Sequence, residues 1–358
     1  MPLRSPAEIR SIGMVTPVGL SAPQTAASVR AGIGRLSESY LSDRFGAPLV
    51  MGLADDEQLP PLIEALEDRR FSPRHERLAR LGGPALVEVL AALPEQPVPL
   101  LLGIAEPRTE ARHSVGEELI EILSTQAGRR LDLSHSRTYP IGRAAGLVAL
   151  GDALTMIDRC EAESVLVGAV DSYLDAGLLE TLDREGRLKT GTIPDGFVPG
   201  EGAAFVLVAA AGAGRRQKSE CVAQISGIGR GREPGHLYSQ EPHRGEGLTA
   251  AFRALFDAVP MDGPADRIEC VYAGLNGESF WAREWGVAQI RSADRFGDDF
   301  RVEHPADCMG DPGAALGLVM LGLAAFDLAR GRRHGPCLVC CASDREERAA
   351  ALLSRVGE

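Results

Sequence analysis

Aromatic residues, long apolar runs and positive charge are all scarce in this sequence of 358 residues. Aromatic side chains make up 5% of it, and the longest apolar stretch, residues 313–326, is too short to cross a bilayer. We therefore expect a buried helix there and no membrane span. Lysine and arginine number 38 against 50 aspartate and glutamate residues, which gives a net charge of −12. Nucleic acid and anionic membranes both attract basic surfaces, so neither is expected as a partner.

The sequence also lacks the pattern of a secreted protein held together by disulfides. It begins with MPLRSPAEIRSIG, which has neither the charged region nor the apolar region of a secretory signal. Its seven cysteines are an odd number spread over a mid-sized chain. We therefore expect reduced thiols and a cytoplasmic protein.

No complete cofactor or metal motif is present. The run CLVCC has one CxxC spacing without a second half, and on a strand Cys337 and Cys341 would face one side and Cys340 the other. This pattern predicts core packing rather than a zinc site. The glycines of GIGRG, residues 227–231, do not complete a GxGxxG motif and open no clear helix, so a dinucleotide site is not expected. We predict no cofactor and no metal.

Short apolar runs alternate with amphipathic segments along the chain. The runs are typical of strands covered by helices on both faces, and they are residues 97–104, 164–170, 203–209, 268–273 and 336–341. The segments between them that read as helices include residues 22–31, 146–159 and 247–259. This alternation predicts an α/β protein with layered sheets.

Similar features recur in the two parts of the chain, which hints at a duplication. IRSIGMV around Ile12 and VAQISGIG around Ile225 are both strand-like and carry glycine, and each is followed later by a strand, a turn of small residues and a buried helix. The polar stretch at residues 212–220 is the natural junction. We predict two halves, residues 1–212 and 213–358.

Four parts of the sequence together resemble the β-ketoacyl synthases of the thiolase superfamily. In order they are GMVTPVGL (13–20), GRAAGLVALGDALTMIDRCEAESVLVGAVDS (142–172), DGFVPGEGAAFVLV (195–208), and the pair CVYAGLNGES (270–279) and MGDPGAALG (309–317). The third is the most specific, and together they span nearly the whole chain. The resemblance implies a thiolase-like fold of duplicated α/β repeats in five layers, αβαβα, and a dimer formed by strands that pair across a two-fold axis.

The catalytic positions of that family hold other residues here. In the family, a cysteine at a helix N-terminus takes the acyl group, because the helix dipole lowers the thiol pKa, and two histidines assist it. The resemblance places Arg143 at the cysteine, Gly274 at the first histidine motif and Asp311 at the second. An arginine has no nucleophilic lone pair, so the condensing chemistry is lost. The expected neighbours of this cleft are Phe197, Asn276, Glu278 and Cys308.

A buried arginine at a helix N-terminus needs an anion beside it, because the helix dipole opposes its charge and burial removes its hydration. Asp311 occupies the facing position, so we predict an Arg143–Asp311 ion pair in the cleft. Two alternatives are that Arg143 turns toward solvent and that it receives an external anion. Cys308, close in sequence to His304, is also a conceivable displaced nucleophile, although a turn residue fits it better.

These observations favour a catalytically inactive ketosynthase homologue that acts through protein contacts, as an adaptor, chaperone or partner subunit. Chain-length factors, which lack the cysteine and pair with an active ketosynthase, are one precedent. The segments TPVGLSAPQTAASVRAGIGR and VDSYLDAGLLETLDREGRL are similar to thiolase-like proteins associated with type VI secretion effectors. The alternatives are an acyltransferase with altered chemistry on acyl-carrier-protein or coenzyme A thioesters, and a sensor of anionic ligands. The expected partners are a second copy, a related subunit, a secreted effector or an acyl-carrier protein.

Overall fold

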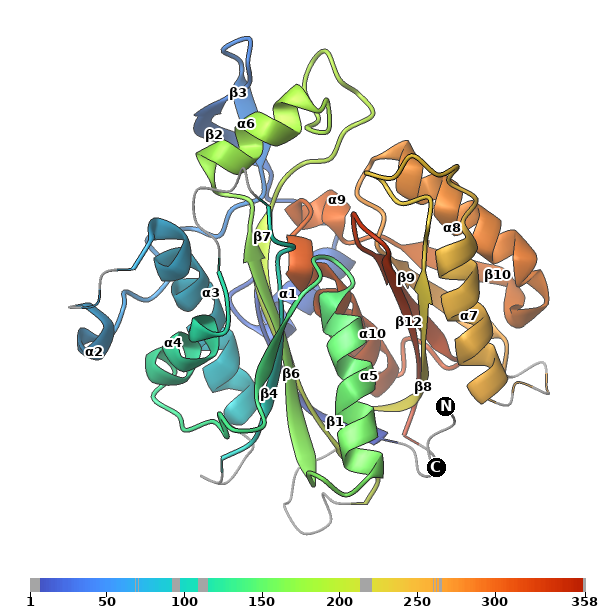
Figure 1. Cartoon of the computed structure of the whole chain (residues 1–358). Helices are drawn as coiled ribbons and strands as arrows, with labels where there is room; N and C mark the ends of the chain where they lie inside the picture. Colours follow the sequence, from blue (N-terminus) through green and yellow to red (C-terminus); the bar gives the residue numbers. More distant parts are fainter. Residues whose placement is uncertain are drawn as a thin grey trace.

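A ten-stranded mixed sheet forms the centre of the protein (Figure 1). The computed structural model describes residues 7–67, 69, 71–91, 97–108, 115–212, 221–259, 261, 263 and 266–356. Across the sheet the strands are, in order, β10 (Phe296–Glu303), β9 (Ile268–Ala273), β11 (Cys337–Ala342), β12 (Glu347–Ser354), β8 (Ala223–Arg232), β1 (Ala7–Val15), β7 (Glu201–Ala210), β6 (Ser164–Ser172), β4 (Leu100–Ile104) and β5 (Arg137–Pro140).

This strand order is the same motif written twice. The sheet divides at its centre into two halves of five strands, which we call its two sides. Outward from the centre one side runs β1–β7–β6–β4–β5 and the other runs β8–β12–β11–β9–β10. The two sides join where Ala7–Ile9 pairs antiparallel with Ala223–Ile225. The chain passes from one side to the other between β7 and β8, as the sequence repeat indicates. The division at residue 212 stays a prediction, and residues 213–220 lie outside the described residues.

Helices cover the outer face of each five-stranded half of the sheet, and further helices lie between the two halves. The result is five layers in the order helix, strand, helix, strand, helix (Figure 1). The bounds of the longer helices are α1 (Ala22–Arg30), α3 (Pro73–Leu90), α4 (Glu118–Gln126), α5 (Ala145–Asp158), α6 (Ala176–Arg184), α7 (Glu246–Ala258), α8 (Ser279–Arg291) and α10 (Leu316–Ala329), and the shorter ones are α2 (Glu64–Glu67), α9 (Ala306–Met309) and the 3₁₀ turns η3 (Ala293–Arg295) and η4 (Gly313–Ala315). Helices α5 and α10 occupy the middle layer, with α3 and α4 outside one side and α7 and α8 outside the other. The apolar run at 313–326 is therefore a buried helix, preceded by the turn η4.

The glycines of the paired strands β1 and β8 let the outer helices approach the sheet. A Cβ at Gly13 would lie 2.0 Å from the carbonyl oxygen of Ala85 on α3. On β8, a Cβ at Gly229 would lie 1.9 Å from the carbonyl oxygen of Ala251 on α7. The GIGRG stretch thus serves close packing of helix against strand, which is consistent with the absence of a dinucleotide motif.

The cysteines of β11 divide between two cores, as their spacing predicts. Cys337 and Cys341 face the central core around α5 and α10, whereas Cys340 faces the outer core with α7. The sequence reading missed a hairpin of β2 (Ser37–Ser42) and β3 (Pro48–Met51), which packs with α6 around a small separate core. Among the described helices none is both long and apolar enough to cross a membrane.

Candidate functional site

Arg143 lies immediately before helix α5, in a cleft between the two sides of the sheet. Its side chain is only 2% exposed. Nη2 donates a hydrogen bond to the carbonyl oxygen of Gly274, just after β9, and the guanidinium lies over the ring of Trp281 at 4.8 Å from its centroid. Arg143 does not cap the helix, because the backbone N–H of the N-cap residue Ala144 donates instead to Ser343 Oγ at 3.0 Å.

Asp311 faces Arg143 from the turn before α10, and the predicted ion pair is present. Arg143 Nε lies 3.0 Å from Asp311 Oδ2. Asp311 also accepts hydrogen bonds from Asn276 Nδ2 at 2.8 Å and from the backbone N–H of Gly313 at 2.9 Å. The contact with Arg143 is one of charge rather than a directed hydrogen bond, because neither Nε nor Nη1 of Arg143 has a hydrogen-bond partner among the described residues. Neither the solvent-facing alternative nor an external anion is needed to explain Arg143.

Burial acts on both members of this pair. It raises the pKa of Asp311, although Arg143 and Asn276 oppose that change. Burial by itself lowers the pKa of Arg143, but Asp311 and the neighbouring acidic groups raise it by more, so the guanidinium stays charged. With a cation 3.0 Å away and two donors on its oxygens, Asp311 is best described as a carboxylate.

A chain of buried charges continues from Asp311 across the cleft. Asn276 Nδ2 also reaches Glu278 Oε2 at 3.1 Å. Both oxygens of Glu278 accept hydrogen bonds from Arg187, at 2.8 and 2.9 Å. Arg187 in turn donates at 2.6 Å to Oδ2 of Asp344, which lies two residues after the end of β11. Although burial opposes it, Arg187 with the other arginines nearby lowers the pKa of Asp344 to about 2.

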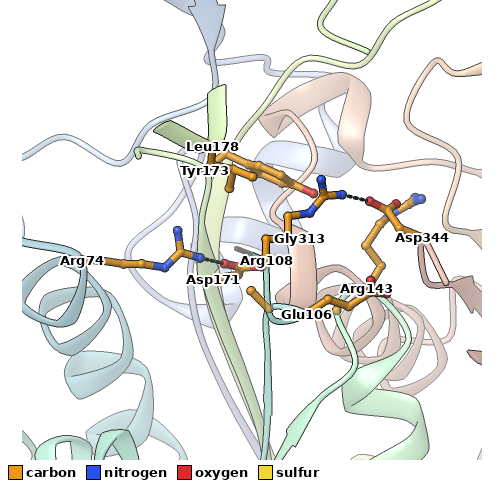
Figure 2. Close-up of a pocket in the computed structure, with 11 residues that line it drawn as sticks. Arg74, Glu106, Arg108, Arg143, Asp171, Tyr173, Leu178, Gly313 and Asp344 are labelled. Carbon is orange, nitrogen blue, oxygen red and sulfur yellow. Dashed lines mark hydrogen bonds and ion pairs between the residues drawn. The ribbon is translucent and has the colours of Figure 1, made fainter. Parts of the chain in front are cut away.

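Arg108 completes the chain of charges at the rim of a small cavity, where it donates to Asp344 at 2.7 Å (Figure 2). It also donates to Tyr238 Oη at 2.6 Å. The cavity has a volume of about 50 Å³. Its lining residues are Arg74, Ala105, Glu106, Arg108, Gly142, Arg143, Asp171, Tyr173, Leu178, Gly313 and Asp344. Space of this size holds roughly a few water molecules.

Glu106 is the one lining group whose ionisation falls near neutral pH. Burial and the nearby Asp344 raise the pKa of Glu106 to about 7, while Arg345 and Arg108 only partly oppose this. Its side chain is 9% exposed, and its Oε1 accepts from the backbone N–H of Arg345 at 3.3 Å. The charge of this one lining residue therefore changes around neutral pH.

The thiol nearest the ion pair is Cys341, which the sequence reading assigned only to packing. Burial raises the pKa of Cys341 to about 11, although Arg143 opposes this. A thiol that stays protonated at neutral pH is a poor nucleophile. Cys308 is half-buried on α9, and within the described part of the chain no interaction joins it to Arg143, Asp311 or His304. His304 instead pairs with Asp307 through Nδ1 at 2.9 Å on the surface, which favours the interpretation of Cys308 as a turn residue.

The residues named from the sequence are thus partly brought together. Gly274, Asn276 and Glu278 contact Arg143 or Asp311 or each other, and Phe197 packs under Arg187 at 5.3 Å from its guanidinium. Cys308 lies apart. Sequence reasoning missed Arg187, Arg108 and Asp344. Only Asp344 left a signal, because it lies two residues after a buried strand and so belongs to the same sheet edge as Gly274.

Several solved ketosynthase structures share this fold. The ishigamide ketosynthase/chain length factor matches with a TM-score of 0.79 at 15% identity, over 99% of this chain and 100% of that one. The ketosynthase from module 6 of the bacillaene synthase of Bacillus subtilis 168 matches with a TM-score of 0.79 at 12% identity, over 99% and 72%. A type II polyketide synthase acyl-carrier protein in complex with its ketosynthase matches with a TM-score of 0.73 at 14% identity, over all of both chains.

At these identities the similarity shows the fold alone. The protein has the thiolase-like fold of ketosynthases, as its sequence motifs predict. No protein-family model matches the chain.

Proposed function

We propose that this protein is a catalytically inactive ketosynthase homologue that acts through protein contacts, as an adaptor or partner subunit. The observation that carries the proposal is the buried Arg143–Asp311 pair at the N-terminus of α5. On the resemblance to β-ketoacyl synthases, Arg143 stands in place of the nucleophilic cysteine and Asp311 in place of a histidine. An ion pair held by Gly274, Asn276 and Trp281 cannot form an acyl-enzyme.

The space around the pair supports the same proposal. A cavity of about 50 Å³ gives little room for an acyl chain. Two buried arginines, a third arginine that is half-buried, and three buried carboxylates fix the cleft walls. Those six residues are Arg108, Arg143, Arg187, Glu278, Asp311 and Asp344. Such a network, in which every charge has an opposite neighbour, suits a rigid scaffold better than a site that must open for substrate.

The proposed partners follow from the fold and the edge of the sheet. β5 is the last strand on its side and pairs with β4 alone in the described sheet. An edge of this kind can pair with a second copy or with a related subunit. The structural matches to a ketosynthase/chain length factor and to an acyl-carrier protein with its ketosynthase support partners of these two kinds. A secreted effector, including one of a type VI system, stands as a further proposed partner on the sequence resemblance.

The competing proposal is an acyltransferase, and Cys341 is the thiol it would use. The test is incubation with acyl-coenzyme A and acyl-carrier-protein thioesters followed by intact-protein mass measurement. We expect no specific adduct, because the Cys341 thiol is buried and its pKa is raised to about 11. The exposed Cys160 is the background control, removed in Cys160→Ser. An adduct that persists in Cys160→Ser and disappears in Cys341→Ser would overturn the proposal of an inactive protein.

Co-purification from the native host tests the partner directly. We expect a complex of fixed stoichiometry, visible by native mass spectrometry, with a related ketosynthase, an acyl-carrier protein or an effector. A chain that stays alone while it is acylated at Cys341 would contradict the adaptor role.

A further inference from the structure

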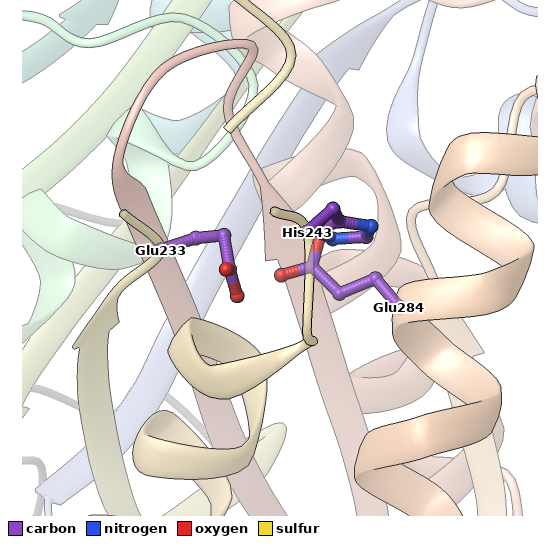
Figure 3. A group of neighbouring side chains, drawn as sticks. All are labelled: Glu233, His243 and Glu284. Atoms are coloured by element: carbon purple, nitrogen blue, oxygen red, sulfur yellow. The ribbon is translucent and has the colours of Figure 1, made fainter. Parts of the chain in front are cut away.

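A second group of buried polar side chains lies away from the cleft, on the outer side of the sheet (Figure 3). Glu233 follows β8, His243 lies in the loop before α7, and Glu284 is on α8. One oxygen or nitrogen atom from each of the three lies within 4.8 Å of the other two. Figure 3 shows the two carboxylates pointing toward one another from opposite sides, with the imidazole beside them.

Glu233 is fixed by two backbone N–H groups, one in the loop after β8 and one at the start of α7. It is 1% exposed, and its oxygens accept from Gly235 N at 3.3 Å and from Gly247 N at 2.7 Å. These bonds hold the carboxylate in one orientation. Each oxygen keeps a second lone pair, so neither bond prevents it from binding a cation.

His243 is held by stacking rather than by hydrogen bonds. Its ring lies parallel to Phe280, with ring centroids 4.0 Å apart and planes 16° from parallel. Nε2 is buried and has no hydrogen-bond partner among the residues that the structure describes. The side chain as a whole is 18% exposed, so the group can be reached from solvent.

Glu284 brings a buried carboxylate oxygen that also lacks a hydrogen bond within the described residues. It is 1% exposed, and Oε1 accepts from Arg348 Nε at 2.7 Å. Oε2 has no hydrogen bond within the described residues and lies 3.8 Å from His243 Nε2. A buried carboxylate oxygen without a hydrogen-bond donor is costly, so a cation or another donor would complete this arrangement.

The distances suit a shared ion better than a direct bond. At 3.8 Å, His243 and Glu284 are too far apart for a hydrogen bond. Two ligands of one tetrahedral ion with bonds of about 2.0–2.1 Å lie about 3.3 Å apart, so small side-chain movements suffice. One imidazole and two carboxylates form a donor set that Zn²⁺ binds readily. We propose that Glu233, His243 and Glu284 bind one divalent transition-metal ion, with Zn²⁺ the best match.

A bound metal ion would connect the end of β8, the loop before α7 and helix α8. The side chain of Trp281 lies between this site and the cleft. Arg348, the partner of Glu284, lies 5.6 Å from the ring centroid of Trp281, and Arg143 lies 4.8 Å from the same ring. Trp281 is therefore placed between the proposed metal site and the ion pair, and its fluorescence reports on the site.

The test is titration of Zn²⁺ into the full chain after treatment with a chelator, followed by calorimetry and by Trp fluorescence. We expect one ion per chain. His243→Gln should weaken binding by more than about 100-fold, because loss of even an outer-shell partner costs about 10–100-fold. His135→Gln is the matched control, since His135 belongs to an exposed His–Asp pair. Glu233→Gln serves as a second variant of the site. His243→Gln and Glu233→Gln should both keep the circular dichroism spectrum of the wild type.

Co²⁺ in place of Zn²⁺ identifies the ligands. We expect the visible absorption of tetrahedral cobalt with nitrogen and oxygen ligands. Absence of stoichiometric binding by the wild type, equal binding by His243→Gln, or a thiolate-to-cobalt charge-transfer band would each overturn the proposal.

Discussion

Asp311→Asn removes the negative charge that faces Arg143 and changes almost no volume. Arg143 would then keep only the carbonyl oxygen of Gly274 and the face of the Trp281 ring as partners, at 2% exposure. Removal of one member of a buried ion pair costs about 3–5 kcal/mol, because the remaining charge has no compensation. We expect a loss of that size in the free energy of unfolding.

Arg143→Met should cost less, about 2–3 kcal/mol. Asp311 would still accept hydrogen bonds from Asn276 and from Gly313, and bonds to a charged group are worth about 1.5–3 kcal/mol each. In the double variant no buried charge is left unpaired. Its loss should therefore fall below the sum of the two single losses by about 1.5 kcal/mol or more.

Urea unfolding at pH 7, followed by circular dichroism and by tryptophan fluorescence, measures these differences. Glu180→Gln is the matched control, because it breaks an exposed pair with Arg184 whose side chains are 71% and 64% exposed. That change should cost less than about 0.5 kcal/mol. A loss below about 1 kcal/mol for Asp311→Asn, or strict additivity of the double variant, would refute the ion-pair reasoning.

Three further predictions concern pH, packing and thiol reactivity. Glu106 has a pKa of about 7 in the folded protein against 4.5 when unfolded, so its contribution to stability, roughly 3 kcal/mol, is fully present below pH 4.5 and is lost as the pH rises through 7. Glu106→Gln should remove that part of the pH dependence of the unfolding midpoint, and an unchanged profile would contradict this reasoning. Gly229→Val should destabilise by about 3 kcal/mol or more in urea unfolding, because its Cβ would meet the carbonyl oxygen of Ala251, and a loss under about 1 kcal/mol would show that α7 can move aside. Iodoacetamide at pH 8 should modify exposed Cys160 and spare buried Cys341, as peptide mass mapping can check, and fast labelling of Cys341 would show that the cleft opens.

The sequence by itself determined the class of fold and the identity of one ion pair. Apolar runs without alternation located the buried strands, because strands covered on both faces tolerate few polar residues. The spacing of the β11 cysteines assigned them to opposite faces, and the motif resemblance set Arg143 against Asp311. A buried cation required an anion, so the pair followed from elementary electrostatics.

Only the tertiary structure decided what surrounds that pair. Arg187 and Asp344 are far apart in sequence and meet because the loop after α6, which bridges to Phe197 at Leu188, comes close to the loop after β11. The group of Glu233, His243 and Glu284 likewise joins a strand end, a loop and a helix. Periodicity in a sequence tells which face of an element is buried, but not which residue of another element lies opposite. That choice depends on how strands are ordered across the sheet, and no local pattern records it.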